Sequence, residues 1–349
     1  MTGGPASRVD AARLWERHQR LARHGALPGG GVNRQALSAE EFAAWRELIG
    51  WARELGLTAY TDAAGNLFLR LEGTDADAAP VMTGSHLDSQ PTGGKFDGVY
   101  GVLAGLEAAQ VIAESGVRLR RPIEIVAWMN EEGSRFAPGM MGSSAFTGAT
   151  PLERFLPVRD RAGIAVEQGL ADLAAAFPDL PVRALKRPVA AYVEAHIEQG
   201  PILEREGYTV GVVTGIQGKR TFRVTVQGVA SHAGTTARHE RKDALLAAVN
   251  MIHALAASTR DAEDLVRFTV GKLDVSPNAP SVVPASVVFS IDLRHVDSAT
   301  LTALGDAVPA ICAANVGACT VDVVELTTAM SLEFPGEMTG LIRRCAKGL

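Results

Sequence analysis

Residues 81–128 alternate between strand and helix in an order that few folds accommodate. Residues 81–83 and 123–128 are short apolar runs typical of buried strands, and the glycine-punctuated stretch 99–115 between them is typical of a helix that ends at Gly116. A strand, a crossover helix and a second strand return the chain in the same direction. This order therefore predicts an α/β domain with a largely parallel sheet covered by helices.

The preceding residues predict further elements of the same domain. Ser38 and Glu41 form a capping box, and apolar residues recur at helical spacing from there until Gly56. Residues 67–71 follow a turn-like segment and predict a strand. We therefore expect the α/β domain to begin well before residue 81.

The pattern changes after about residue 220. The expected order there is βαββαβ, which is typical of a ferredoxin-like unit with helices layered on an antiparallel sheet. This unit is either an insertion or a second domain after the larger α/β domain. The predicted elements are residues 221–228, 242–258, 266–274, 286–293, 298–315 and 319–325.

The length and charge of the chain narrow the possible function classes. A chain of 349 residues favours two domains of roughly 100 to 200 residues each. Its 34 basic and 39 acidic side chains give a net charge of -5, which argues against a nucleic-acid-binding surface. The sequence has no apolar run of the about 18 residues that a membrane span needs, and residues 1–10 lack a signal peptide's apolar stretch. We therefore expect a cytoplasmic protein without nucleic-acid or membrane partners, and three cysteines spaced unlike a disulfide framework fit that compartment.

Polar residues directly follow the predicted strands. His86 and Asp88 come after the run 81–83, Asp97 precedes the helix at 99, and Glu131 and Glu132 follow the run 123–128. Ligands bind beyond the carboxyl ends of the strands in an open parallel sheet. These side chains are therefore the first candidates for a functional site.

A fourth candidate segment is 194–200, where polar and apolar residues alternate. The alternation places His196, Glu194 and Glu198 on the side away from the apolar residues. Imidazole and carboxylate are ligands of zinc and manganese, and a dinuclear site needs a carboxylate such as Asp97 that bridges two cations roughly 3.5 to 4 Å apart. Each segment alone is also explained by a structural His–Asp pair or by acidic residues at a helix start. The combination favours a metal site, in which an adjacent Glu-Glu pair supplies one ligand and one free base.

The chain resembles the hydantoinase/carbamoylase family of metal-dependent amidases. This family includes N-carbamoyl-L-amino-acid hydrolases, allantoate amidohydrolases and β-ureidopropionases, and it lies within the aminoacylase and carboxypeptidase G superfamily. The matching stretches follow the family's order over nearly the whole chain: residues 84–89, 95–101, 130–136, 194–201, 231–236 and 291–295.

The resemblance implies a site with two divalent cations, zinc or manganese. His86 and His196 would hold one cation, Asp97 would bridge, and Glu132 would hold the second. Glu131 would be the general base that activates the attacking water and later returns the proton to the leaving amine.

The resemblance also assigns residues around these ligands. Asp88 would fix the ring of His86. His232 would reach toward the substrate, often across a dimer, and polarise the carbonyl under attack. Arg294 would clamp the substrate carboxylate with its planar fork, although an ion pair on an edge strand is an alternative explanation. Gln199 would also contact the substrate.

Two departures from the family pattern matter. Ser281 stands where the family has an asparagine that helps to bind the substrate carboxylate, so we expect that group to be held differently. In addition, the family continues for several tens of residues beyond the equivalent of Leu349, with a Gly-His-Asp motif whose histidine completes the second metal site. We therefore expect this chain to be truncated, with an incomplete second site.

The fold and activity follow as expectations from the resemblance. It implies a large metallohydrolase domain with a parallel or mixed sheet, formed by residues 1–212 and 329–349, and an inserted ferredoxin-like (βαββαβ) lid and dimerisation domain formed by residues 213–328. The expected protein is a homodimeric amidohydrolase that cleaves the carbamoyl C–N bond of N-carbamoyl-L-amino acids or related ureido acids, such as allantoate or ureidopropionate.

The alternatives are a peptidase or aminoacylase of the wider superfamily, and a catalytically inactive truncated dimerisation protein. The histidine at position 196 favours the carbamoylase, because peptidases of the superfamily carry a carboxylate there.

Overall fold

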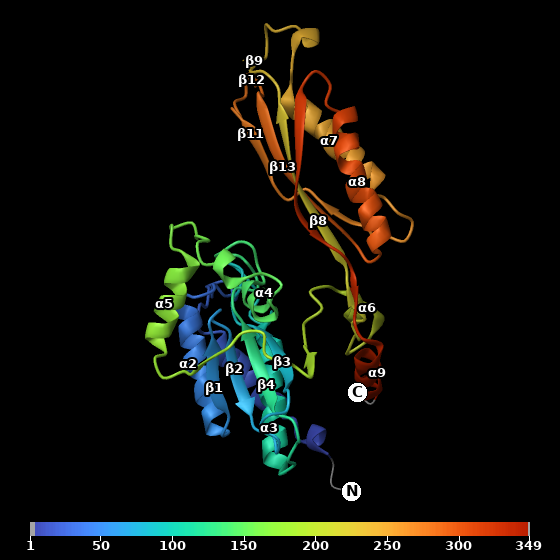
Figure 1. The fold of residues 1–349 in the computed structure, drawn as a ribbon. Coiled ribbons are helices and arrows are strands. Elements are labelled where there is room, and N and C mark those ends of the chain that lie inside the picture. Colours follow the sequence, from blue (N-terminus) through green and yellow to red (C-terminus); the bar gives the residue numbers. More distant parts are fainter. Residues whose placement is uncertain (1–3, 348–349) are drawn as a thin grey trace. The chain divides into compact units, whose positions relative to one another are not determined.

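A computed structural model describes residues 4–347 of the chain. The described residues form two compact units, with Gly200 the last residue of the first unit and Pro201 the first residue of the second. Figure 1 shows the elements of both units, which are described separately below. None of the helices within residues 4–347 has the length and apolar character needed to cross a membrane.

The first unit is built on a six-stranded mixed sheet with the order β5-β1-β2-β4-β3-β6. The predicted strand–helix–strand unit is confirmed: β3 and β4 pair in parallel, and α3 lies between them in sequence. β2 pairs in antiparallel fashion with both β1 and β4, so the sheet is mixed rather than largely parallel. The strands are β1 (Thr58–Asp62), β2 (Leu67–Leu71), β3 (Val81–His86), β4 (Ile123–Trp128), β5 (Val182–Arg183) and β6 (Ala191–Val193).

Helices α2 and α3 place the main apolar core of this unit against the sheet. Ser38 accepts a hydrogen bond from the backbone N–H of Glu41, as the capping box predicts, and α3 ends at Gly116 in the left-handed conformation. Leu48 from α2, Leu103 from α3 and Ile125 from β4 belong to one buried cluster. Each such side chain stabilises the unit by about 1.5–3 kcal/mol. The helices are η1 (Pro5–Arg8), α1 (Ala11–Leu21), α2 (Ala39–Glu54), α3 (Val99–Ser115), α4 (Met141–Thr147), η2 (Leu152–Arg154) and α5 (Val166–Ala176).

The second unit contains the predicted succession of strands and helices, with one difference. Residues 266–274, expected as one strand, form β10 and β11, which pair with different parts of β13 and are interrupted at Gly271. Helices α7 and α8 contact each other and pack on β13 (Figure 1). The elements are α6 (Ile202–Glu206), β7 (Gly215–Ile216), β8 (Gly218–Gln227), β9 (Ser231–His232), η3 (Arg238–Glu240), α7 (Ala244–Ser258), β10 (Arg267–Thr269), β11 (Leu273–Ser276), β12 (Val282–Val283), β13 (Ser286–His295), α8 (Ser298–Ala314), β14 (Thr320–Ala329), β15 (Leu332–Glu333) and α9 (Gly336–Ala346).

Buried and less buried residues alternate strictly along β13, so they lie on opposite faces of its sheet. Val287, Phe289, Ile291 and Leu293 are buried in a cluster with residues of α7 and α8. The intervening residues, which include Arg294, lie on the opposite face. The period-two pattern of the sequence therefore corresponds to a sheet that is covered by helices on one side.

One buried histidine of the first unit gives the stability a pH dependence. His18 on α1 is 3% exposed, and its ring lies 5.5 Å from that of Phe96 and 6.0 Å from that of Tyr100. Neither ring nitrogen has a hydrogen-bond partner among the described residues. Burial lowers the pKa of His18 to about 4. The unfolded chain therefore binds a proton at a higher pH than the folded one, and this residue costs stability as the pH falls from 6.5 toward 4.

We expect His18→Phe to remove this pH dependence, since phenylalanine fills the same aromatic site without a titrating group. The wild-type free energy of unfolding should fall, relative to the variant, by on the order of 2 kcal/mol between pH 7 and pH 5. Urea unfolding at the two pH values measures this difference, with His253→Gln as a control because His253 is exposed. Equal pH dependence in the wild type and His18→Phe would contradict the assignment.

Candidate metal centre

Three side chains of the first unit bring ligand atoms together. His86 is the last residue of β3, Asp97 precedes α3, and His196 follows β6. One ligand atom of each residue lies within 4.8 Å of the others. Two parallel strand ends and a helix start therefore meet at the edge of the sheet where the sequence placed the site.

The two histidine rings are oriented in the same way. Nδ1 of His86 lies 2.8 Å from the backbone oxygen of Asp88, and Nδ1 of His196 lies 2.7 Å from that of Ile197. A ring whose Nδ1–H donates to a carbonyl presents the lone pair of Nε2. Nε2 lies 3.9 Å from Asp97 Oδ1 for His86 and 3.3 Å for His196.

Asp97 Oδ1 is the atom on which this arrangement converges. It is buried and has no hydrogen-bond partner among the described residues, whereas Oδ2 accepts a hydrogen bond of 2.6 Å from Gln199 Nε2. A buried carboxylate oxygen without a hydrogen-bond partner is costly, and the Nε2 lone pairs of two neutral imidazoles would add repulsion. A divalent cation relieves both, so the donor set suits zinc or manganese.

A glycine gives the His86 ring its space. Gly98 has a φ of +66°, and a Cβ there would lie 2.5 Å from atoms of the ring. Any other residue at position 98 would displace the imidazole or strain the backbone. The Asp97-Gly98 pair therefore contributes to the site in two ways: Asp97 is a candidate ligand, and Gly98 leaves room for the ring of the candidate ligand His86.

Asp88 holds the loop that carries both glutamates. Asp88 is 1% exposed, and its carboxylate accepts hydrogen bonds from the backbone N–H groups of Glu131 at 3.1 Å and Glu132 at 3.2 Å. The same carboxylate lies 3.6 Å from His86 Nδ1, whose hydrogen-bond acceptor is instead the backbone oxygen of Asp88. Asp88 thus connects the end of β3, which its backbone oxygen contacts, to the segment after β4, which its carboxylate contacts.

The two adjacent glutamates point to different partners. Glu131 Oε2 lies 3.5 Å from His86 Nε2. Glu132 lies outside the group of three ligand atoms, and its Oε2 accepts a hydrogen bond of 2.9 Å from Gln90 Nε2. The sequence pattern did not single out Gln90, because the residue that accepts its hydrogen bond, Glu132, follows a different strand.

The electrostatics favour proton uptake by Glu131. Burial raises the pKa of the Glu131 carboxyl, the carboxylates of Asp88, Glu132 and Glu194 raise it further, and His86 opposes them. A carboxylate with a raised pKa is a stronger base near neutral pH. Glu131 therefore combines proximity to the ligand group with the basicity that a proton acceptor needs.

The remaining candidate residues belong to the second unit. His232 pairs with Val282 in the β9–β12 ladder, and the backbone N–H of Ala233 donates to the oxygen of Ser281. The structure therefore places His232 and Ser281 beside each other. His232 Nδ1 accepts from the backbone N–H groups of Gly234 and Thr235.

Arg294 lies on the face of the β13 sheet that the helices leave uncovered. β13 is a central strand, with β10 and β8 on its two sides, so Arg294 is not on an edge strand. Its guanidinium nevertheless forms a two-point ion pair with Asp292, at 2.8 and 3.1 Å, and Lys219 also contacts that carboxylate at 3.3 Å. Arg294 and Asp292 border a hollow of about 590 Å³ that Arg267 and Thr269 also line.

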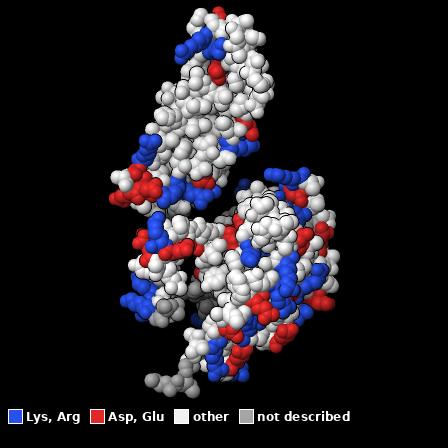
Figure 2. Space-filling model, turned by 180° about the vertical axis from the view of Figure 1, so that it is seen from behind, with Lys and Arg blue, Asp and Glu red and all other residues white. Residues whose placement is uncertain are grey.

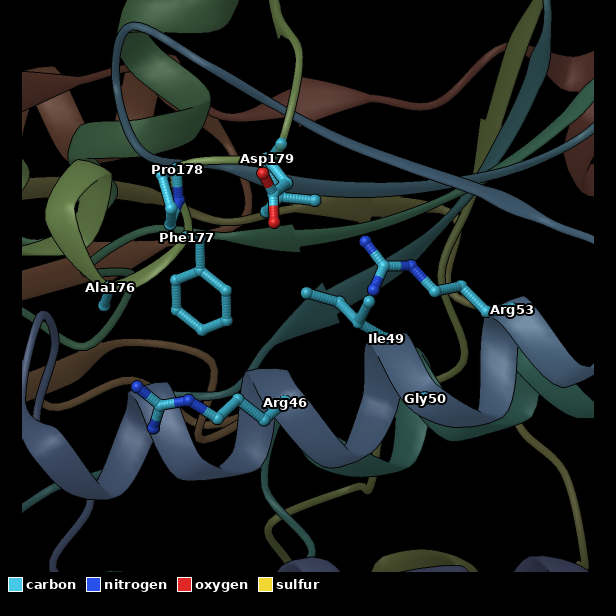
Figure 3. Close-up of a pocket in the computed structure, with 9 residues that line it drawn as sticks. Arg46, Ile49, Gly50, Arg53, Ala176, Phe177, Pro178 and Asp179 are labelled. Carbon is cyan, nitrogen blue, oxygen red and sulfur yellow. The ribbon is translucent and has the colours of Figure 1, made fainter.

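A second hollow lies on the first unit and contains none of the candidate residues. Figure 3 shows Arg46 and Arg53 from α2 on one side of it, with the ring of Phe177 and the carboxylate of Asp179 opposite. Its volume is about 290 Å³. The convergence of ligand atoms, and not the presence of a hollow, therefore identifies the candidate site.

Comparison with known proteins gives relatives over most of the chain. The model of Peptidase family M20/M25/M40 matches residues 82–349. An N-carbamoyl-L-amino acid amidohydrolase from Geobacillus stearothermophilus is 45% identical over 290 residues, which are 82% of this chain and 70% of the relative. An allantoate amidohydrolase from Bacillus subtilis is 37% identical, and the match covers 79% of this chain and 66% of the relative. A crystal structure of a hydantoinase/carbamoylase family amidase from Burkholderia ambifaria has a TM-score of 0.84 at 42% identity, covering 97% of this chain and 82% of that one.

Proposed function

This chain belongs to the hydantoinase/carbamoylase amidases of Peptidase family M20/M25/M40, and we propose that it hydrolyses the carbamoyl C–N bond of N-carbamoyl-L-amino acids or related ureido acids. The observation that supports this proposal most strongly is the convergence of His86 Nε2, His196 Nε2 and the unpartnered Asp97 Oδ1. The relatives named above act on N-carbamoyl-L-amino acids and on allantoate.

His86, Asp97 and His196 would hold the first cation, and Asp97 and Glu132 would hold a second. The ligand types suit zinc or manganese. A divalent cation, when bound, acts as a Lewis acid and lowers the pKa of the attacking water. Asp88 orients His86 and the glutamate loop through its backbone oxygen and its carboxylate.

Glu131 would move the proton in this reaction. Its carboxylate accepts a proton from water as the water attacks the ureido carbon, and it returns that proton to the amine when the C–N bond breaks. The released carbamate then gives carbon dioxide and ammonia. His232 would donate a hydrogen bond to the developing oxyanion, Arg294 and Ser281 would bind the substrate carboxylate, and Gln199 would contact the substrate.

The second unit supports a role for a homodimer. Arg294 lies eight residues after Ser286 along β13, which corresponds to about 26 Å at about 3.3 Å per residue, whereas His232 and Ser281 lie by β12, just before Ser286. One small ureido acid cannot reach across that length. His232 of one copy and Arg294 of another would therefore serve the same site.

The domain and compartment assignments are part of the same proposal. Residues 213–328 would form an inserted ferredoxin-like lid and dimerisation domain, and residues 1–212 with 329–349 would form the catalytic domain. Leu246 and Val249 on α7 are 55% and 49% exposed, and Figure 2 shows few charged side chains over much of the visible face of the second unit, which suits a surface that another copy covers. The cytoplasm is supported by Cys312, Cys319 and Cys345, which are all free thiols.

A substrate panel tests the proposed reaction. We expect purified protein supplied with manganese or zinc to release free amino acid and ammonia in equal amounts from an N-carbamoyl-L-amino acid, or ammonia from allantoate or ureidopropionate. N-acetyl amino acids and dipeptides serve as the comparison substrates. Turnover of those compounds without turnover of any ureido acid would instead identify a peptidase or aminoacylase.

A further inference from the structure

The strand pairing that leads to His196 stops before the histidine is reached. β3 and β6 pair in parallel from Val81↔Ala191 to Thr83↔Val193. His86 and His196 each lie three residues beyond that last pair, and the segment after Val193 is not a strand. Something other than the ladder must therefore hold the His196 segment next to β3.

Beyond the last pair of the ladder, the carboxylate of Glu194 connects the two segments. Its Oε1 accepts a hydrogen bond of 2.5 Å from the hydroxyl of Ser85, and its Oε2 accepts one of 2.5 Å from the hydroxyl of Tyr192. Ser85 is 1% exposed and directly precedes His86. Glu194 lies two residues before His196, so its side chain connects the two ligand-bearing segments across residues that the ladder does not join.

The connection extends to the third strand end of the site. Nε1 of Trp128, the last residue of β4, donates to the Tyr192 hydroxyl at 3.1 Å. β4 leads directly into the loop of Glu131 and Glu132. Ser85, Trp128, Tyr192 and Glu194 therefore form a brace across the ends of β3, β4 and β6.

We propose that Glu194 is a positioning residue that holds His196 against His86 and thereby sets the geometry of the metal site. The inference rests on the proposed metal site, since it concerns the separation of two of its ligands. Partners that orient metal ligands typically change metal affinity by about 10- to 100-fold. The brace would act on metal affinity and coordination geometry, because none of its four side chains is itself a proposed ligand.

Cobalt binding to the apo-protein tests the brace. Glu194→Ala is expected to weaken Co²⁺ binding by about 10- to 100-fold and to change the visible absorption of the bound ion. Glu194→Gln is expected to stay within a few-fold of the wild type, because its amide oxygen accepts from one hydroxyl and its NH₂ group donates to the other. Glu167→Ala removes an exposed carboxylate of the same unit and is the matched control.

Each result bears on a different claim. Wild-type affinity and spectrum in Glu194→Ala, in a protein whose thermal unfolding shows that it is folded, would overturn the brace alone. A loss in Glu194→Gln as large as that in Glu194→Ala would also overturn it, because the charge rather than the connection would then matter. A wild-type protein that binds no Co²⁺ would overturn the proposed metal site and the brace together.

Discussion

Replacement of His86 by alanine is expected to remove both the bound metal and the turnover of ureido acids. His86 supplies one of three converging ligand atoms, and the residue is 2% exposed, so no other described side chain can take its place without a large shift of the chain. Loss of a direct ligand should exceed the about 10- to 100-fold effect of losing a partner that only orients one. We therefore expect metal content and activity to fall below detection together.

Metal analysis after extensive dialysis, combined with an activity assay, measures both effects. His24→Ala is the control, because His24 lies in the same unit but pairs with Glu47 at 2.7 Å, away from the ligand group. The control should keep its metal and its activity. Unchanged metal content and activity in His86→Ala would show that the catalytic centre lies elsewhere.

The second large effect is expected for Glu131→Gln. The amide has nearly the shape of the carboxylate but cannot accept a proton, so kcat should fall by on the order of 10² to 10⁴. Glu131 is not one of the three converging ligands, and metal content should therefore remain close to that of the wild type. This separation of turnover from metal binding distinguishes a base from a ligand.

Glu132→Gln is the matched comparison for that experiment. The neighbouring glutamate is proposed as a ligand of the second cation, so its variant should lose metal as well as turnover. Steady-state kinetics and metal content of the two variants, measured side by side, check the assignment. A Glu131→Gln enzyme with kcat within a few-fold of the wild type would rule out Glu131 as the base.

Much of the candidate site was predictable because its candidate ligands follow local patterns. The strand–helix–strand order predicted His86 shortly after a strand at 81–83 and Asp97 before the helix at 99. The structure extends that strand, β3, to His86 itself and begins α3 at Val99, with Asp97 before it. For position 196, the sequence predicted only that the side chain lies on the polar face of a segment in which polar and apolar residues alternate. The structure instead ends β6 at Val193 and carries His196 on irregular backbone.

The features that escaped prediction depend on pairing over long sequence separations. β1 has only Ala59 and Tyr60 as apolar residues, and its assignment as a strand depends on its pairing with β2. The split of residues 266–274 follows from the length of β13, which two short strands share. Glu194 was visible as a polar residue, but the hydroxyl of Ser85 that holds it lies 109 residues away in the sequence. The periodicity of a sequence predicts which face of a strand or helix is polar. It does not predict which atom of a distant segment contacts that face.

Anomalous X-ray scattering from crystals grown with manganese or zinc would locate the cation without reference to activity. We expect a peak about 2.0–2.2 Å from His86 Nε2, His196 Nε2 and Asp97 Oδ1. Crystals of an active protein that show no peak between these three atoms, or a peak at a different set of ligands, would contradict this expectation.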